Sequence, residues 1–348
     1  MLTSSSECWR NIMHWELLPD AVTANIAARI LAATSGCSEV TDFYGLHSAR
    51  QTCRAWYGSM LPQTGSVRRI VLPGVFDTWE FSQNPPVYTR VYGFDELLGW
   101  ALDIAGEGSE SLDTGPSGYM LTDAGLDIIA NSRMASSLTS LHMPDSGVSD
   151  TGIGLLASLV NLTYLNMEGI ETSLETVALL PSITHLKIDI FRPDERAQNV
   201  ENLRAMPLLV SLSFGSQTII SDRDLPKLPR QLRILALPEY ERLTMPRISD
   251  EGLEMLPGCL TSLDLSDIEY VTDDGIGRLP RLLPGLTSLR LGHCSEEITD
   301  VGIASLAALR SLELLDIRDI DFPVLDEVIA ELTGRFKVLY THYSEDIY

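Results

Sequence analysis

The chain has 348 residues, with 48 acidic side chains against 25 basic ones and a formal net charge of −23 at pH 7. Such an excess of negative charge repels phosphate backbones and anionic lipid surfaces, which argues against nucleic acid or a membrane as a partner. With 45% hydrophobic and 21% charged residues, the composition is typical of a folded protein and excludes a mostly disordered chain.

The sequence predicts no targeting segment and no disulfide framework. Its start has neither the apolar stretch of a secretory signal nor the Arg-rich, acid-poor character of a transit peptide. No apolar run approaches the roughly 18 residues that a membrane helix needs. The five cysteines are widely spaced and include no Cys-x-x-Cys pair, so we expect reduced thiols and no metal site. We therefore expect a cytoplasmic or nuclear location.

Residues 15–61, which follow a tail of residues 1–14, are expected to be helical. Four apolar residues recur at a spacing of four and share one face of a first helix: Leu18, Val22, Ile26 and Ile30. Pro19 lies near the start of that helix, where proline is tolerated. A second helical stretch runs from about residue 42 to residue 61. These helices either bind a partner through their apolar face or only cap the structure that follows.

Residues 62–118 are expected to hold a first strand and an irregular, aromatic-rich stretch. The sequence SVRRIVL at 66–72 is consistent with a strand. Residues 73–118 show no clear repeat, and the stretch is much longer than a turn. It is therefore predicted to be either an insertion or a strongly diverged repeat. The aromatic side chains in this stretch are either anchors for a partner or pack the stretch onto its neighbours.

Residues 119–340 carry an internal repeat. The pattern Leu-x-x-Leu-x-Leu, or an apolar variant of it, begins at Leu138, Leu162, Ile183, Leu209, Leu232, Leu260, Leu286 and Leu312. The intervals between these positions, 21 to 28 residues, fall within the roughly 20 to 29 residues of a leucine-rich repeat. A ninth, degraded copy starts at Phe336 and includes Leu339.

Each repeat predicts a strand followed by a helix. The alternating leucines indicate a strand with one buried face. Five segments further along the units read Ser/Thr-Asp-x-Gly-Ile/Leu. A hydroxyl side chain ahead of an apolar run is typical of a helix start. The five segments begin at Thr122, Ser149, Ser249, Thr272 and Thr299. The units after Leu162, Ile183 and Leu209 lack this motif, and Pro226 and Pro229 argue against a full helix in the last.

The predicted fold class is therefore α/β, a leucine-rich-repeat solenoid with a parallel inner sheet and outer helices. It extends over residues 119–340, with the small helical domain of residues 15–61 before it and a tail of residues 341–348 after it.

Two segments resemble known families. Residues 289–317 are similar to the cysteine-containing subclass of leucine-rich repeats, with Cys294 at the position of its cysteine. Leu18-Pro19-Asp20, Ile30-Leu31 and Cys53-Arg54-Ala55-Trp56 are, in this order and ahead of such repeats, similar to the F-box pattern. The resemblance implies an F-box-like domain at 15–61 that docks a Skp-family adaptor and so joins a cullin-RING ubiquitin ligase. The adaptor-facing side chains would be Leu18, Pro19, Ile26 and Ile30.

The third and fifth residues of each Leu-x-x-Leu-x-Leu segment are expected to face the concave side of the solenoid, because the leucines point inward. Most of this surface is small and polar. A more distinctive cluster combines Tyr164, Asn166, His185 and Lys187, and charged residues follow further along at Asp264 and Arg290. We predict that these six residues bind a protein target.

The sequence contains no nucleotide-binding glycine motif, no His-Glu-x-x-His and no Gly-x-Ser-x-Gly, so we expect no catalysis, no cofactor and no metal. The leading hypothesis is a non-catalytic substrate receptor of a Skp-cullin-F-box type ubiquitin ligase. The alternative is a leucine-rich-repeat scaffold subunit of a larger assembly, with no ubiquitin role. Only three of the 25 basic residues are lysine, the residue to which ubiquitin is attached. That scarcity suits a ligase subunit, although codon bias in a GC-rich genome would produce the same composition.

Overall fold

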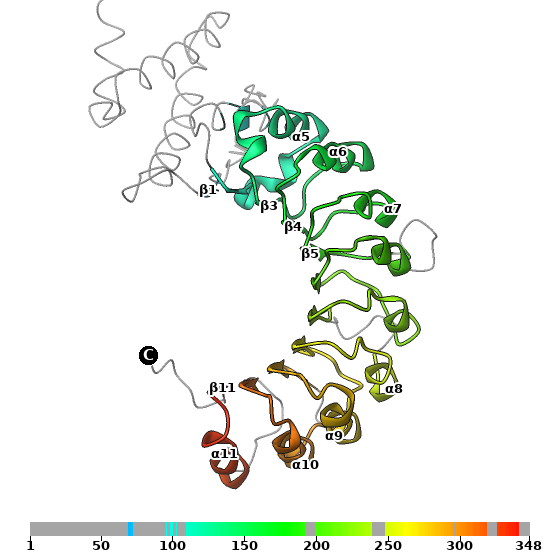
Figure 1. Ribbon diagram of the computed structural model, residues 1–348, viewed down its shortest axis with the longest axis vertical. Coiled ribbons are helices and arrows are strands. Elements are labelled where there is room, and N and C mark those ends of the chain that lie inside the picture. Colours follow the sequence, from blue (N-terminus) through cyan, green and yellow to red (C-terminus); the bar gives the residue numbers. More distant parts are fainter. Residues whose placement is uncertain are drawn as a thin grey trace, which may run out of the picture.

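The computed structural model describes residues 69–71, 95, 98–99, 102, 109–191, 199–238, 248–294, 297–318 and 326–340. These residues form one curved solenoid, with the strands on the inner side of the arc and the helices on its outer side (Figure 1). The fold is the α/β leucine-rich-repeat solenoid that the repeat predicts.

The described strands form one parallel sheet in which every strand pairs with the next along the chain. They are β1 (Arg69–Val71), β2 (Ser111–Asp113), β3 (Ser140–His142), β4 (Tyr164–Met167), β5 (His185–Ile188), β6 (Ser211–Phe214), β7 (Ile234–Ala236), β8 (Ser262–Asp264), β9 (Ser288–Arg290), β10 (Leu314–Asp316) and β11 (Val338–Tyr340). The register is the same throughout, as in the pairing of Leu212 with Leu235. Equivalent repeat positions therefore line up as continuous columns across the sheet.

The outer layer consists of short helices. The α-helices are α5 (Asp123–Ala130), α6 (Asp150–Leu155), α7 (Leu174–Val177), α8 (Asp250–Leu253), α9 (Asp273–Leu282), α10 (Asp300–Ser305) and α11 (Asp326–Thr333). The 3₁₀-helices are η2 (Gly115–Met120), η3 (Arg133–Ser136), η4 (Leu156–Ser158), η6 (Val200–Ala205), η7 (Leu225–Lys227) and η8 (Leu306–Ala308). Among the described residues, the three units without the Asp-x-Gly motif contain α7, η6 and η7 and no longer helix. Pro226 lies in η7, which is a single short turn, as Pro226 and Pro229 predict.

The hydroxyl residues predicted to start helices lie at the N-caps. The side chains of Thr122, Ser149, Thr272 and Thr299 each accept a hydrogen bond from the backbone N–H two residues later. Ser249 is also an N-cap residue, but its side chain makes no such bond. Its hydroxyl lies instead against the carboxylates of Asp222, at 2.6 Å, and Glu251, at 2.7 Å.

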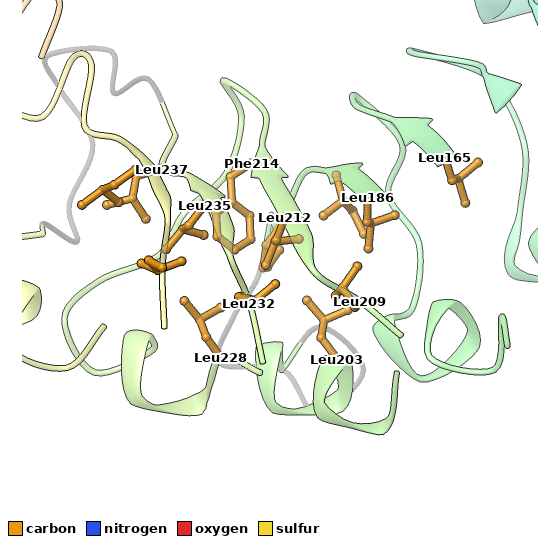
Figure 2. Packing of buried hydrophobic residues seen from close by; sticks show 14 of the residues in the cluster. Leu165, Leu186, Leu203, Leu209, Leu212, Phe214, Leu228, Leu232, Leu235 and Leu237 are labelled. Atoms are coloured by element: carbon orange, nitrogen blue, oxygen red, sulfur yellow. The ribbon is translucent and has the colours of Figure 1, made fainter. Parts of the chain in front are cut away.

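The core is a continuous layer of apolar side chains between the sheet and the outer helices. Figure 2 shows Leu186, Leu212 and Leu235 of the strands pointing toward Leu203 and Leu228 of the outer layer. All five are at most 2% exposed. Because full burial of one leucine is worth about 1.5 to 3 kcal/mol, the repeated leucines hold strand and helix together in every unit.

The solenoid also includes residues upstream of the first leucine pattern. β2 lies within the stretch 73–118 and pairs on one side with β1 and on the other with β3. Leu98 and Leu102 are helical and buried in the same core as the later repeats. Of the two alternatives for this stretch, the described residues fit a diverged repeat. At the other end, β11 forms at the degraded ninth copy.

The segment 15–61 and the tail 341–348 lie outside the described residues. The expected F-box-like helices and the division of the chain into domains therefore stay predictions.

Candidate protein-binding surface on the concave face

Two columns of side chains cover the concave face, one on each side of the buried leucine column. The first column comprises Ser111, Ser140, Tyr164, His185, Ser211, Ile234, Ser262, Ser288, Leu314 and Val338. The second comprises Asp113, His142, Asn166, Lys187, Ser213, Ala236, Asp264, Arg290, Asp316 and Tyr340. All of these side chains are exposed or half-buried except Asp316, which is buried. The predicted alternation of inward leucines and outward residues is thus observed.

Three rings stack across neighbouring strands near the N-terminal end of this face. The His142 ring lies 4.6 Å from the Tyr164 ring, centroid to centroid, with an interplanar angle of 25°. The Tyr164 ring lies 6.4 Å from that of His185 at an angle of 24°. The Nδ1 atom of His185 lies 2.8 Å from the hydroxyl of Thr184, which orients the imidazole. Strand register therefore places an aromatic surface where most of the face carries small side chains.

Asn166 and Lys187 lie next to the stack, on β4 and β5, and are direct register partners. The ammonium of Lys187 lies 2.5 Å from a carboxylate oxygen of Glu168. The side-chain oxygen of Asn166 accepts a hydrogen bond from the backbone N–H of Glu168 at 3.1 Å. The four residues of the predicted cluster are therefore brought together, and Glu168 joins them from the turn after β4.

Asp264 and Arg290 form a separate pair further along the sheet. They are register partners on β8 and β9, and their charged groups lie 3.5 Å apart. β6 and β7 separate this pair from the cluster around Tyr164. The six predicted residues thus occupy two places on the same face rather than one site.

The C-terminal end of the face holds a charged and aromatic group that the sequence did not single out as a binding site. Arg318 donates two hydrogen bonds to the carboxylate of Asp316, at 2.9 and 2.8 Å, and its guanidinium lies 4.7 Å from the centre of the Tyr340 ring. Burial by itself would raise the pKa of Asp316. The hydrogen bonds from Arg318, with the charges of Arg318 and Arg290, outweigh burial and hold this pKa below its ordinary value.

His142 and Arg318 are two of the residues of this surface that sequence reasoning did not select as binding residues. His142 occupies a concave position in the repeat, but only the register shows that its ring reaches Tyr164 on the next strand. Arg318 follows β10 and lies outside the Leu-x-x-Leu-x-Leu segment, so no concave position includes it.

Cys294 is a packing residue. It is buried, burial raises the pKa of its thiol to about 12, and its Sγ donates to the carbonyl of Leu265 at 3.1 Å. Ser146, Ile170 and Ile268 occupy the same place in their repeats and are also buried. A small or apolar side chain therefore satisfies this position, and cysteine meets the requirement as a small hydrophobe.

In the part of the chain that the structure describes, no group of three or more His, Cys, Asp or Glu side chains is arranged to hold a metal ion. No helix there has the length and apolar character to cross a membrane. The predicted adaptor-binding residues, Leu18, Pro19, Ile26 and Ile30, lie outside the described residues.

No protein-family model matches the chain, and no curated protein matches it. Among solved structures, the chain is similar to the crystal structure of the Rad7 and Elc1 complex in yeast, with a TM-score of 0.47 and 17% identity over 70% of this chain and 64% of that chain. It therefore spans less than two thirds of that protein. It is also similar to an internalin from Listeria monocytogenes, with a TM-score of 0.43 and 17% identity over 94% of this chain and 77% of that chain.

Proposed function

We propose that the chain is a non-catalytic receptor that binds a protein target on the concave face of its solenoid. The observation that carries the proposal is the ring stack of His142, Tyr164 and His185 beside Asn166 and Lys187. Aromatic side chains are preferred anchors in protein interfaces, and here they lie on a rigid sheet that loses little entropy on binding. Asp264 and Arg290 would provide a second, charged contact to the same target.

The more specific proposal is a substrate receptor of a Skp-cullin-F-box type ubiquitin ligase, acting in the cytoplasm or nucleus. Its support is the similarity of residues 15–61 to the F-box pattern and of residues 289–317 to the cysteine-containing repeats. In this proposal Leu18, Pro19, Ile26 and Ile30 bind a Skp-family adaptor, which connects the chain to a cullin. The solenoid then selects the protein to be modified, and no cofactor is needed.

Co-expression with a Skp-family adaptor and a cullin, followed by size-exclusion chromatography, tests this role. We expect the wild-type chain to elute with the adaptor and a folded Leu18→Ala, Pro19→Ala double variant to elute without it. The matched control is Tyr164→Ala, which should keep the adaptor because it lies on the target face. If folded wild type never elutes with the adaptor, the ligase role is wrong and the helices are a cap.

A second candidate is a scaffold subunit of a larger assembly with no ubiquitin role. Three large apolar side chains favour it: Val160, Leu179 and Leu208 are 67%, 72% and 51% exposed. They lie in the segments that lead into β4, β5 and β6, so the feature recurs in three consecutive repeats. Exposed apolar side chains in neighbouring repeats suit burial against another subunit.

The scaffold role is tested by native size-exclusion of the tagged chain from its own cells. A Val160→Glu, Leu179→Glu variant should leave a large complex if these side chains are buried in an assembly, whereas Tyr164→Ala should remain in it. Retention of the double variant in the complex would argue against docking through these side chains.

A further inference from the structure

The three lysines of the chain, Lys187, Lys227 and Lys337, all lie in described residues, and each is held in an ion pair. The ammonium nitrogen lies 2.5 Å from Glu168 in the first case, 2.8 Å from Asp224 in the second and 2.6 Å from Glu313 in the third. The pairs differ in their surroundings, and the difference decides which amine can react.

Lys227 is held by a buried carboxylate. The side chain of Asp224 is 1% exposed and that of Lys227 is 32% exposed. Asp224 also accepts hydrogen bonds from the backbone N–H and the hydroxyl of Ser221, at 3.1 and 3.0 Å. Withdrawing the ammonium would leave a buried carboxylate without its counter-charge, which is strongly unfavourable. This amine is therefore kept in its pair.

Lys187 is held within the concave face. Its side chain is 34% exposed, and that of its partner Glu168 is 27% exposed. Asn166 lies beside it as its register partner. A target bound to the concave face would cover this amine further.

Lys337 and its partner are more exposed to solvent than the other two pairs. Its side chain is 72% exposed and that of Glu313 is 53% exposed. An ion pair this open is screened by water and salt and holds its members only weakly. Lys337 directly precedes β11, at the C-terminal end of the arc and at the opposite end of the sheet from β1 (Figure 1).

We propose that Lys337 is the single lysine of this chain that serves as an acceptor for acyl transfer, and so the lysine at which a ubiquitin ligase containing the chain would modify it. The donor is a thioester, such as ubiquitin linked to the cysteine of a conjugating enzyme. The ammonium first loses a proton to solvent. The neutral Nζ then attacks the thioester carbonyl, the C–N amide bond forms as the C–S bond breaks, and the second proton lost from nitrogen balances protonation of the leaving thiolate.

The higher reactivity of the Lys337 amine does not depend on the proposed ligase role. The transfer of ubiquitin to Lys337 rests on that role. If both hold, self-modification is confined to one place on the solenoid. That place lies beside β11, whereas the His142, Tyr164 and His185 stack lies on β3 to β5, so modification would leave the stack itself accessible.

The first experiment needs no ligase. The purified chain is treated with limiting N-hydroxysuccinimidyl acetate, and acetylation at each lysine is followed by mass spectrometry of peptides cut at acidic residues. We expect Lys227 to react about tenfold more slowly than Lys337, because its amine must leave a buried carboxylate. We expect Lys187 to fall between them. Equal rates at all three lysines would overturn the proposal.

The matched variants keep the positive charge. Lys337→Arg should remove most of the fast acetylation, while Lys187→Arg and Lys227→Arg should leave it in place. Glu313→Gln should keep Lys337 the fastest site, because the exposed pair is weak. Loss of the fast site in Glu313→Gln would show that the carboxylate, rather than exposure, makes Lys337 reactive, and would contradict the argument.

The second experiment uses a reconstituted ligase with adaptor, cullin, conjugating enzyme and ubiquitin. If the chain assembles and ubiquitin is found on Lys337 but not after Lys337→Arg, the acceptor assignment is supported. If it assembles and ubiquitin is found on Lys187 or Lys227, the assignment is wrong although the ligase role stands. If it fails to assemble, the ligase role fails, and the acetylation order alone tests the higher reactivity of the Lys337 amine.

Discussion

Asp273 and Thr299, which belong to consecutive repeats, are joined by two hydrogen bonds. The carboxylate of Asp273 accepts from the backbone N–H of Thr299 at 2.7 Å and from its hydroxyl at 2.6 Å. It also accepts from the backbone N–H of Gly302 at 2.9 Å. The same hydroxyl accepts a bond from the N–H of Val301 and so caps its own helix. The N-cap therefore has to both donate and accept, which a hydroxyl can do and a carboxylate cannot.

This pattern recurs along the outer layer as an inter-repeat ladder. In each case the carboxylate of one repeat accepts from the N–H and the hydroxyl of the next N-cap: Asp95 with Thr122, Asp123 with Ser149, Asp222 with Ser249 and Asp250 with Thr272. The glycine of the motif leaves room for that carboxylate. The hydroxyl residue, the aspartate and the glycine of Ser/Thr-Asp-x-Gly thus each have a role in joining repeats.

The role of the motif glycine can be tested within one helix. A Cβ at Gly152 would lie 2.3 Å from Oδ1 of Asp123, whereas a Cβ at Gly154 meets nothing within 4 Å. We expect Gly152→Ala to lower the free energy of unfolding by about 1 to 3 kcal/mol through overpacking. We expect Gly154→Ala to raise it by about 0.5 to 1 kcal/mol through helix propensity. Urea denaturation measures both, and equal effects of the two variants would contradict the ladder.

The carboxylate of the ladder can be tested against its neighbour in α9. Asp273→Ala removes the acceptor of three hydrogen bonds and should lower the free energy of unfolding by about 2 kcal/mol. Asp274→Ala alters the exposed residue beside it and should change stability by less than about 0.5 kcal/mol. Thermal denaturation followed by circular dichroism compares them. Equal losses would show that helix charge, not the inter-repeat bonds, matters here.

The hydrogen bonds of the inter-repeat ladder should make the free energy of unfolding depend on pH. The hydrogen bonds from the side chain and backbone of Ser149 lower the pKa of Asp123 below its ordinary value of 3.8. A carboxyl whose pKa is lower in the folded state stabilises the fold above its unfolded pKa, and that contribution is lost as pH falls through the folded pKa. We therefore expect Asp123→Asn to be less stable than wild type at neutral pH. The difference should shrink as pH falls from 3.8 through the lower pKa of the folded state, and should disappear below that pKa. Urea denaturation at several pH values measures this, and a difference that stays constant with pH would refute it.

A buried aspartate joins three repeats where the motif is missing. Asp189 is 2% exposed and accepts from the N–H of Gly169 at 2.7 Å, the N–H of Gln217 at 3.0 Å and the hydroxyl of Thr218 at 2.9 Å. Asp189→Ala leaves these donors without their acceptor and should lower the free energy of unfolding by about 3 kcal/mol. Ser213→Ala, on the concave face, should change it by less than about 0.5 kcal/mol. Chemical denaturation measures the free energy of unfolding of both variants. A loss below about 1 kcal/mol in Asp189→Ala would mean that water replaces the carboxylate as hydrogen-bond acceptor.

The sequence by itself determined the repeat, the fold class, the inward leucines and the outward positions, because these follow from a local period that each unit repeats. It missed β2 because the two positions that flank Leu112 in the pattern hold Ser109 and Thr114, which are buried but polar. It identified the helix-capping hydroxyls, since a cap acts within its own helix.

Only the tertiary structure decided which residues meet across repeats. The bond between Asp273 and Thr299, the stacking of His142 on Tyr164 and the burial of Asp224 beneath Lys227 all depend on how the chain folds around each residue. In the first two, the partners are separated by about one repeat length, and the uniform register of the parallel sheet brings them together. Hydrophobic periodicity specifies which side of a unit is buried, but it does not specify which polar side chain of the next unit lies opposite.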